Sequence, residues 1–188
     1  CADSFDEVTI NRTTPIIANA GTDQVICTTF VQLSGNVIVG NSGNGTWTQI
    51  QGTGLIGNPN AAVTTVNNLS AGVNRFVYSI TTPSCPNPST DTVDVTRSAD
   101  PTTANAGNNQ TVCASNATLS GNTASSGTGK WTRISGSGNI SNDANPNSAV
   151  TGLGLGANVF RWTISNPPCA DSFDEVTINR TTPIIANA

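Results

Sequence analysis

The sequence predicts an all-β protein built from consecutive β-sandwich modules, and three observations support this prediction. Apolar and polar residues alternate with a period of two in several segments, for example from Arg75 to Ile80. Clusters of Gly, Asn, Ser and Pro separate these segments at intervals of about 8–12 residues, which is typical of a sandwich. No stretch shows the spacing of apolar residues that an amphipathic helix needs.

The strands can be placed in chain order in each module. Early strands are marked by Val31 with Leu33 and by Ala117 with Leu119, and long aromatic strands end at Ile80 and Ile164. Alternation places the aromatic residues of a strand on one face of its sheet, with polar residues on the other. We therefore predict about seven strands in each module, the last containing Val93 and Val95 or Val176 and Ile178. The predicted core residues are Trp47, Trp131, Phe76, Phe160, Tyr78 and Trp162, and replacing a core tryptophan with alanine should cost on the order of 3 kcal/mol.

The chain repeats itself at two levels. The twenty residues from Cys169 to Ala188 are identical in sequence to those from Cys1 to Ala20, so the two copies are 168 residues apart. Within that period, ANAGTDQVIC at 18–27 returns as ANAGNNQTVC at 104–113, and the LSGN, WT and NPN motifs that follow also return. Such internal periodicity indicates a segment of a longer repeat array with two homologous modules per period.

Three parts are expected from this periodicity. Residues 1–17 would be the last strand and linker of a preceding module, residues 18–103 the first module, and residues 104–188 the second module with the start of the next linker. The strand in 1–17 lacks its sandwich, so we expect a neighbouring copy to complete it, or the segment to be poorly ordered. The linkers carry Pro15, Pro101 and Pro183, which favours stiff, extended joints.

Composition argues against several classes of function. Charged residues make up 10% of the chain, the net charge is −4, and the seven basic residues are scattered. A nucleic-acid or anionic-membrane partner is not expected, because either needs clustered Lys and Arg. No apolar run approaches the length of a membrane span. Without histidine the usual general base is missing, so we predict no enzyme activity, no catalytic residue and no cofactor.

No metal site is predicted either. The chain has no Cys-x-x-Cys pair and no histidine, which argues against zinc. The acidic cluster of Asp171, Asp174 and Glu175 could suggest calcium, which needs six to eight oxygen ligands. A solvated loop and a charged strand start explain this cluster better.

The recurring motifs resemble those of a known family. AGTDQ, an LSG strand, a WTxI strand, a GxxxFxWTI segment and a DxVTI strand are similar to PKD-type immunoglobulin-like modules. More narrowly, they resemble the cysteine-bearing tandem modules of giant Bacteroidota surface adhesins, the SprB-like gliding-motility adhesins. This resemblance implies an extracellular, cell-surface location and a role in a stalk or filament. The expected partners are neighbouring copies of the repeat in one long chain, with surface glycan or other cells reached through regions outside this sequence.

Five cysteines in so polar a chain favour disulfides formed in an oxidising compartment. Pairing within modules would join Cys27 to Cys85 and Cys113 to Cys169, with the partner of Cys1 outside the sequence. A bridge needs Cα atoms within about 7 Å, and the first turn and last hairpin of such a sandwich usually lie at opposite ends. The alternative joins Cys27 to Cys169 and so links successive modules. Free thiols are the remaining alternative.

Two further hypotheses concern surface residues. Asp91-Thr92-Val93 matches the Asp-Ser/Thr-aliphatic O-glycosylation motif of Bacteroidota, with Thr92 as the acceptor. A carbohydrate- or protein-binding role would use loop residues such as Arg133 or the Asn-rich turns. Near-identical repetition favours a spacer, because binding loops tend to differ between modules.

Overall fold

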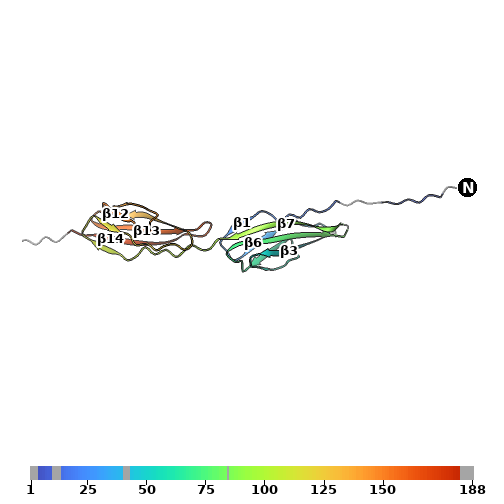
Figure 1. Cartoon of the computed structure of the whole chain (residues 1–188), viewed down its shortest axis with the longest axis horizontal. Coiled ribbons are helices and arrows are strands. Elements are labelled where there is room, and N and C mark those ends of the chain that lie inside the picture. The colour runs from blue at the N-terminus through green and yellow to red at the C-terminus, as the bar shows by residue number, and fades with distance from the viewer. Residues whose placement is uncertain (1–3, 10–13, 40–42, 84, 183–188) are drawn as a thin grey trace, which may run out of the picture. The chain divides into compact units, whose positions relative to one another are not determined.

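The computed structural model describes residues 4–9, 14–39, 43–83 and 85–182, with the side chains of residues 85 and 86 left out. Every regular element in these residues is a β-strand, which confirms the all-β prediction (Figure 1). Contacts divide the chain into two compact units, Cys1–Arg97 and Ser98–Ala188. Each unit contains one sandwich of the immunoglobulin type, as the sequence predicted.

The first sandwich has two sheets that face each other across one core. The four-stranded sheet has the order β1-β7-β6-β3, and the three-stranded sheet has the order β2-β5-β4. Its strands are β1 (Gln24–Ile26), β2 (Val31–Ser34), β3 (Asn44–Gln51), β4 (Leu55–Ile56), β5 (Val63–Asn67), β6 (Gly72–Thr82) and β7 (Cys85–Arg97).

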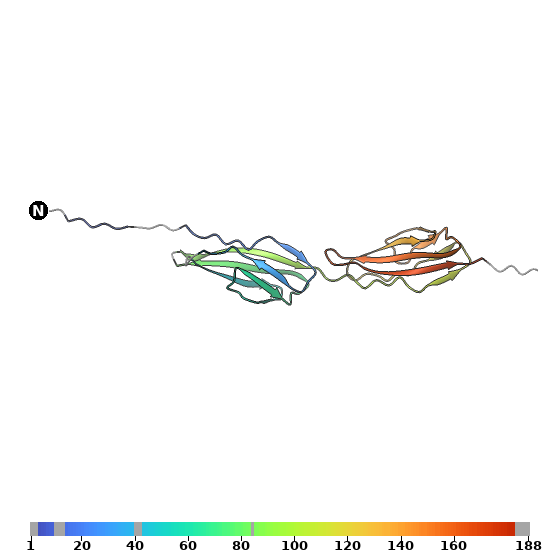
Figure 2. The ribbon, with the colours of Figure 1, turned by 180° about the vertical axis from the view of Figure 1, so that it is seen from behind.

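The second sandwich repeats this topology strand for strand. Its four-stranded sheet has the order β10-β13-β14-β8 and its three-stranded sheet the order β11-β12-β9. Its strands are β8 (Gln110–Val112), β9 (Asn116–Thr118), β10 (Thr128–Ser135), β11 (Asn139–Ile140), β12 (Ala149–Thr151), β13 (Gly156–Ser165) and β14 (Ser172–Arg180). Seen from behind, the long strands of each unit again run side by side (Figure 2).

The predicted alternation is present in the long strands. In β6, Phe76, Tyr78 and Ile80 are buried while the residues between them are half-buried, and β13 shows the same pattern. Residues at every second position share one face of a strand, so the aromatic side chains of these strands meet in the core. The packed residues of each sandwich form one hydrophobic cluster.

The first and last strands of each sandwich pair in parallel. Ile26 of β1 stands opposite Arg97 of β7, and Val112 of β8 stands opposite Arg180 of β14. Because β1 and β8 have only three residues each, periodicity could not reveal them. This parallel pairing places the end of the first strand beside the residue where the chain leaves the sandwich.

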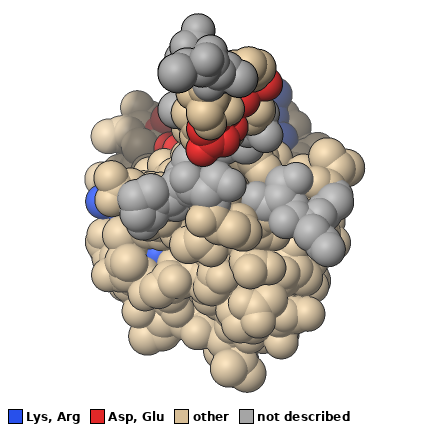
Figure 3. Space-filling view, turned by 90° about the vertical axis from the view of Figure 1, so that its right-hand side faces the viewer, with Lys and Arg blue, Asp and Glu red and all other residues tan. Residues whose placement is uncertain are grey.

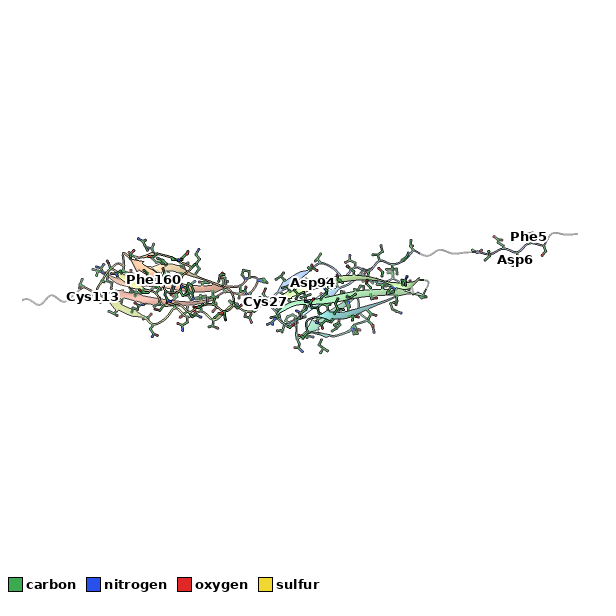
Figure 4. The ribbon with its side chains drawn as sticks, in the orientation of Figure 1. Phe5, Asp6, Cys27, Asp94, Cys113 and Phe160 are labelled. Atoms are coloured by element: carbon green, nitrogen blue, oxygen red, sulfur yellow. The ribbon has the colours of Figure 1, made fainter. Side chains whose placement is uncertain are left out.

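Residues 4–9 form no strand, although the same letters form most of β14 in the second unit. Phe5 and Val8 are 92% and 83% exposed, and Phe5 is labelled in Figure 4. Their counterparts in β14 are Phe173, which is exposed, and Val176, which is buried between the sheets. The difference lies in tertiary context, because a strand needs a neighbour for its backbone hydrogen bonds. The residues 10–13 and Pro183 lie outside the described part of the chain.

Candidate functional site

Paired aromatic rings lie at the centre of each core. Trp47 packs against Tyr78 with ring centroids 4.7 Å apart, and Trp131 packs against Trp162 at 5.1 Å. All four are among the largest fully buried side chains, together with Phe76 and Phe160. The indole N–H groups of Trp47 and Trp131 donate to the carbonyls of Ala62 (3.2 Å) and Pro146 (3.0 Å), so burial leaves neither polar group unpaired.

In each sandwich, a glycine lies two residues before Trp47 or Trp131 and makes room for the aromatic ring that packs against that tryptophan. A Cβ atom at Gly45 would overlap the Tyr78 ring, and one at Gly129 would overlap the Trp162 ring. The Gly-x-Trp pattern of both modules is therefore a packing requirement.

A buried asparagine ties three chain segments together in each sandwich. In the second sandwich, Asn158 Nδ2 donates to the carbonyls of Gly154, Gly156 and Ile178 at 2.9, 3.1 and 3.2 Å, and its Oδ1 accepts from Ser137 N–H at 2.8 Å. In the first sandwich, Asn74 makes the same kind of contacts. A buried amide whose groups are all paired specifies local geometry strongly.

The segment that leads into each sandwich is held by side chains from the last strand. The N–H of Ala18 donates to Ser89 Oγ at 2.9 Å, and the N–H of Ala20 donates to Asp91 Oδ2 at 2.8 Å. In the second sandwich, the N–H groups of residues 104 and 106 donate at the same distances to Ser172 and Asp174. Asp174 therefore lies near the start of β14, in agreement with the expected charged strand start, and its carboxylate holds the backbone of the incoming segment.

The asparagine of each LSGN motif holds the same segment from the other side. Asn36 Oδ1 accepts from Asn19 N–H at 2.8 Å, and its Nδ2 donates to the carbonyl of Ile17 at 3.1 Å. Asn122 makes the equivalent two bonds at 2.8 and 2.9 Å. The segment just before the first strand is thus a structured part of the sandwich.

The cysteines differ in state. Cys27 and Cys169 are disulfide-bonded, whereas Cys113 is a free, exposed thiol. Cys113 and Cys27 are labelled in Figure 4, each at the end of its unit where the first strand stops. Cys1 and the side chain of Cys85 lie outside the description.

The within-module pairing does not fit these observations. Cys113–Cys169 is wrong because Cys113 is free. Cys27 follows Ile26, which stands opposite Arg97 at one end of β7, and Cys85 begins β7 at the other end. The thirteen residues of that strand span about 40 Å, far beyond the reach of a disulfide.

Ion pairs lie on the outer face of each four-stranded sheet. Arg75 contacts Asp94 through two bonds of 2.6 and 2.7 Å, and the guanidinium holds the pKa of Asp94 below its usual value, chiefly through hydrogen bonding. Arg161 binds Glu175 at 2.7 Å and lies over the ring of Phe173, 4.3 Å from its centroid. Figure 3 looks at the molecule end-on, from the right-hand side of Figure 1, and most of the surface in this view is uncharged, with acidic side chains gathered near its top.

The remaining predicted surface residues are accounted for as follows. Thr92 is exposed in the middle of β7, opposite Val77 of β6. Arg133 donates from Nη1 to the carbonyl of Gly138 at 3.1 Å and lines a shallow groove beside Trp131. The turn asparagine Asn142 also lines this groove. Among the described residues, no helix could span a membrane.

Comparison with known proteins extends the fold assignment. No protein-family model matches the chain, and no curated protein sequence matches it. Among solved structures, extracellular domains 3–5 of Drosophila OTK align with 88% of this chain at 9% identity and a TM-score of 0.60. Immunoglobulin domains 1–5 of Sidekick-1 align with 88% at 12% identity (TM-score 0.59), and the insect immune protein hemolin with 89% at 10% identity (TM-score 0.53).

The chain spans 60% of the OTK structure, 38% of the Sidekick-1 structure and 47% of the hemolin structure. At these identities the likeness shows the fold. The chain is thus a tandem of immunoglobulin-like sandwiches.

Proposed function

We propose that this chain is a structural repeat unit in the stalk or filament of a long cell-surface adhesin, of the kind used in gliding motility or surface attachment by Bacteroidota. The observation that carries the proposal is the identity of residues 1–20 and 169–188. An exact copy at a period of 168 residues, containing two complete sandwiches, is the signature of an array that grows by repetition. The role of a spacer needs no ligand site in each copy.

The cysteines support an extracellular location for this stalk. Disulfides persist in oxidising compartments and are rare in the cytosol. Both Cys27 and Cys169 are in the bonded state. Extracellular domains of other proteins also share the tandem fold.

We propose further that Cys27 and Cys169 are bonded to each other. Cys27 stands next to the pair Ile26 and Arg97, at the point where the chain leaves the first sandwich. In the second unit, Cys169 Sγ lies 3.8 Å from the carbonyl oxygen of Ser98 and 3.4 Å from that of Ala99. Ser98 directly follows Arg97 in the chain, so both sulfurs flank the same short stretch of backbone.

Peptide mapping tests this bond. All five cysteines fall in different tryptic peptides, because Arg or Lys occurs between each neighbouring pair. Digestion without reduction should link peptide 13–75 to peptide 162–180. A link from 13–75 to the peptide of Cys1 or Cys85 would contradict the pairing.

A length series tests the stalk. Chains with one, two and three periods should appear in electron micrographs as thin rods whose length grows by a constant increment per period. Reduction of the disulfides in a parallel sample serves as the control for stiffness. Globules whose diameter grows only with the cube root of mass would rule out the stalk.

A second candidate function is recognition of carbohydrate or protein by the sandwich surface. The groove beside Trp131 places Lys130, Arg133 and Asp143 at one surface, where they could pair with polar groups of a ligand. The domain arrangement of hemolin, which shares the fold, has implications for homophilic adhesion by that protein. Specific binding of the chain on a glycan array, lost in Arg133→Ala, would favour this function over a pure spacer.

Thr92 is proposed as an O-glycosylation site on the stalk. Its side chain is exposed on β7, and the neighbouring Asp91 carboxylate is engaged with the N–H of Ala20. The intact mass of chain secreted by a Bacteroidota host should exceed the sequence mass by a glycan. Thr92→Ala should remove that excess, and an unmodified parent chain would refute the site.

A further inference from the structure

The bonded Cys27 and the free Cys113 occupy equivalent places in the two sandwiches. Each follows the last residue of a first strand, Ile26 or Val112, which pairs in parallel with Arg97 or Arg180. Each therefore stands beside the chain as it leaves its sandwich. Cys113 Sγ lies 3.7 Å from Thr181 Oγ1, and Thr181 follows Arg180 as Ser98 follows Arg97. The same position is a disulfide in one sandwich and an exposed thiol in the other.

Cys85 and Cys169 form the complementary pair of positions. Cys169 lies three residues before Ser172, and Cys85 lies four residues before Ser89. Both serines accept the hydrogen bond that anchors the segment leading into their own sandwich. In the second unit, the sulfur of Cys169 contacts the carbonyls of that incoming segment. In the second unit, the cysteine before the last strand thus lies beside the incoming chain. In both units, the cysteine after the first strand lies beside the outgoing chain.

The sequence identifies which sandwich follows Cys113. Residues 181–188 have the same letters as residues 13–20, the segment that leads into the first sandwich. A continuing array therefore places a copy of the first sandwich after the second, and that copy brings its own Cys85. This Cys85 would be the partner of Cys113, just as Cys169 is the proposed partner of Cys27.

We propose that Cys113 is the site of a second kind of disulfide, formed with Cys85 of the following copy of the first sandwich, so that every joint of the array is bridged. This inference rests on the proposed repeat array. Two thiols lose two protons and two electrons to form the bond. A small-molecule or protein disulfide accepts them by two exchanges. The Cys113 thiolate attacks one sulfur of this disulfide and releases its first half, leaving the second half bonded to Cys113 as a mixed disulfide. The Cys85 thiolate then attacks the Cys113 sulfur and displaces that second half. Both halves of the oxidant leave as thiols.

The test uses a two-period chain, made of residues 1–188 followed directly by a second copy of residues 21–188. The chain is oxidised with glutathione disulfide, free thiols are alkylated, and the monomer fraction is digested with trypsin without reduction. Peptide 98–130, which contains Cys113, should be linked to peptide 76–97, which contains Cys85. About half of the Cys113 peptide should be alkylated, because the second copy has no sandwich after it.

Matched variants separate this inference from the pairing of Cys27 with Cys169. Cys113→Ser in the first copy should abolish the 98–130 to 76–97 link and leave the 13–75 to 162–180 link intact. Cys27→Ser in both copies should do the reverse. The 188-residue chain should give fully alkylated Cys113. Complete alkylation of Cys113 in the two-period chain, or its linkage to Cys1 or Cys169, would overturn the inference even if the other bond forms.

Discussion

The phenol of Tyr78 donates a hydrogen bond to the main-chain carbonyl of Asn36 at 3.2 Å. In the second sandwich the indole Nε1 of Trp162 donates to the carbonyl of Asn122 at 3.1 Å. Two chemically different rings therefore make the same contact with the LSGN motif. Tyr78 is the single tyrosine of the chain, so its ionisation can be measured directly.

Alkaline pH should destabilise the first sandwich through Tyr78. Burial raises the pKa of this phenol above 10.0. The neutral ring therefore stabilises the fold fully below the unfolded pKa of about 10, and this contribution is lost as pH rises through the raised folded pKa. Absorbance of the phenolate should appear at a higher pH in the folded chain than in the unfolded chain. Tyr78→Phe should remove this alkaline loss, and a normal phenol titration in the parent would contradict the prediction.

Asn158→Ala should destabilise the second sandwich by about 3 kcal/mol, because it leaves a buried N–H and several carbonyls without a partner. Hydrogen exchange of the β13 amides measures the effect on this sandwich alone. Asn179→Ala is the matched control, since Asn179 is exposed on β14, and its effect should stay within about 0.5 kcal/mol. Equal effects of the two substitutions would show that the buried amide has no special role.

Asp174→Ala should loosen the segment that enters the second sandwich. The carboxylate accepts the N–H of Ala106 at 2.8 Å, and a hydrogen bond to a charged group contributes about 2 kcal/mol. The amide of Ala106 should exchange faster in the variant. Asp171→Ala, three residues away at an exposed position, should leave that amide unchanged. An unchanged exchange rate in Asp174→Ala would show that the Asp174 carboxylate does not hold the incoming segment.

Acid should weaken the first sandwich through Asp94. The Arg75 guanidinium lowers the pKa of this carboxyl, so its stabilising contribution is present above the unfolded pKa of about 3.9 and is lost as pH falls through the lower folded value. Asp94→Asn should therefore be less stable than the parent at neutral pH and converge with it in strong acid. Titration of the carboxyl carbon by NMR should give a pKa below 3.9, which returns toward that value in Arg75→Gln.

Alternation and internal repetition predicted the fold class, the long strands and their buried rings. The burial of Asn158 could have been predicted from its position. It lies two residues before Phe160 and four before Trp162, so it shares the inward face of the same strand. Polarity alone suggests an outward side chain at this position. Its recurrence as Asn74 in the other module is the cue that could have revealed it.

The disulfide pairing could not be predicted from the sequence, because it depends on which end of a sandwich each loop occupies. The decisive fact is the parallel pairing of the three-residue strand β1 with the end of β7. No pattern in so short a segment reveals that pairing. The absence of a strand at residues 4–9 also depends on tertiary context. Their sequence is identical to part of β14, but among the described residues they have no neighbouring strand to pair with.

The side-by-side arrangement of the incoming segment and the last strand has a mechanical consequence. The chain enters the first sandwich with Ala18 against Ser89 and leaves it at Arg97, beside Ile26. In a chain whose disulfides have been reduced, tension applied to the two ends would slide these parallel segments along each other. Their contacts, from the hydrogen bonds to Ser89 and Asp91 to the β1–β7 ladder, would have to break together. A hairpin pulled open at one end loses its bonds one at a time. Each sandwich of the reduced chain is therefore loaded in shear, so that its contacts share the pulling force, whereas a disulfide between Cys27 and Cys169 would carry the force past the sandwiches.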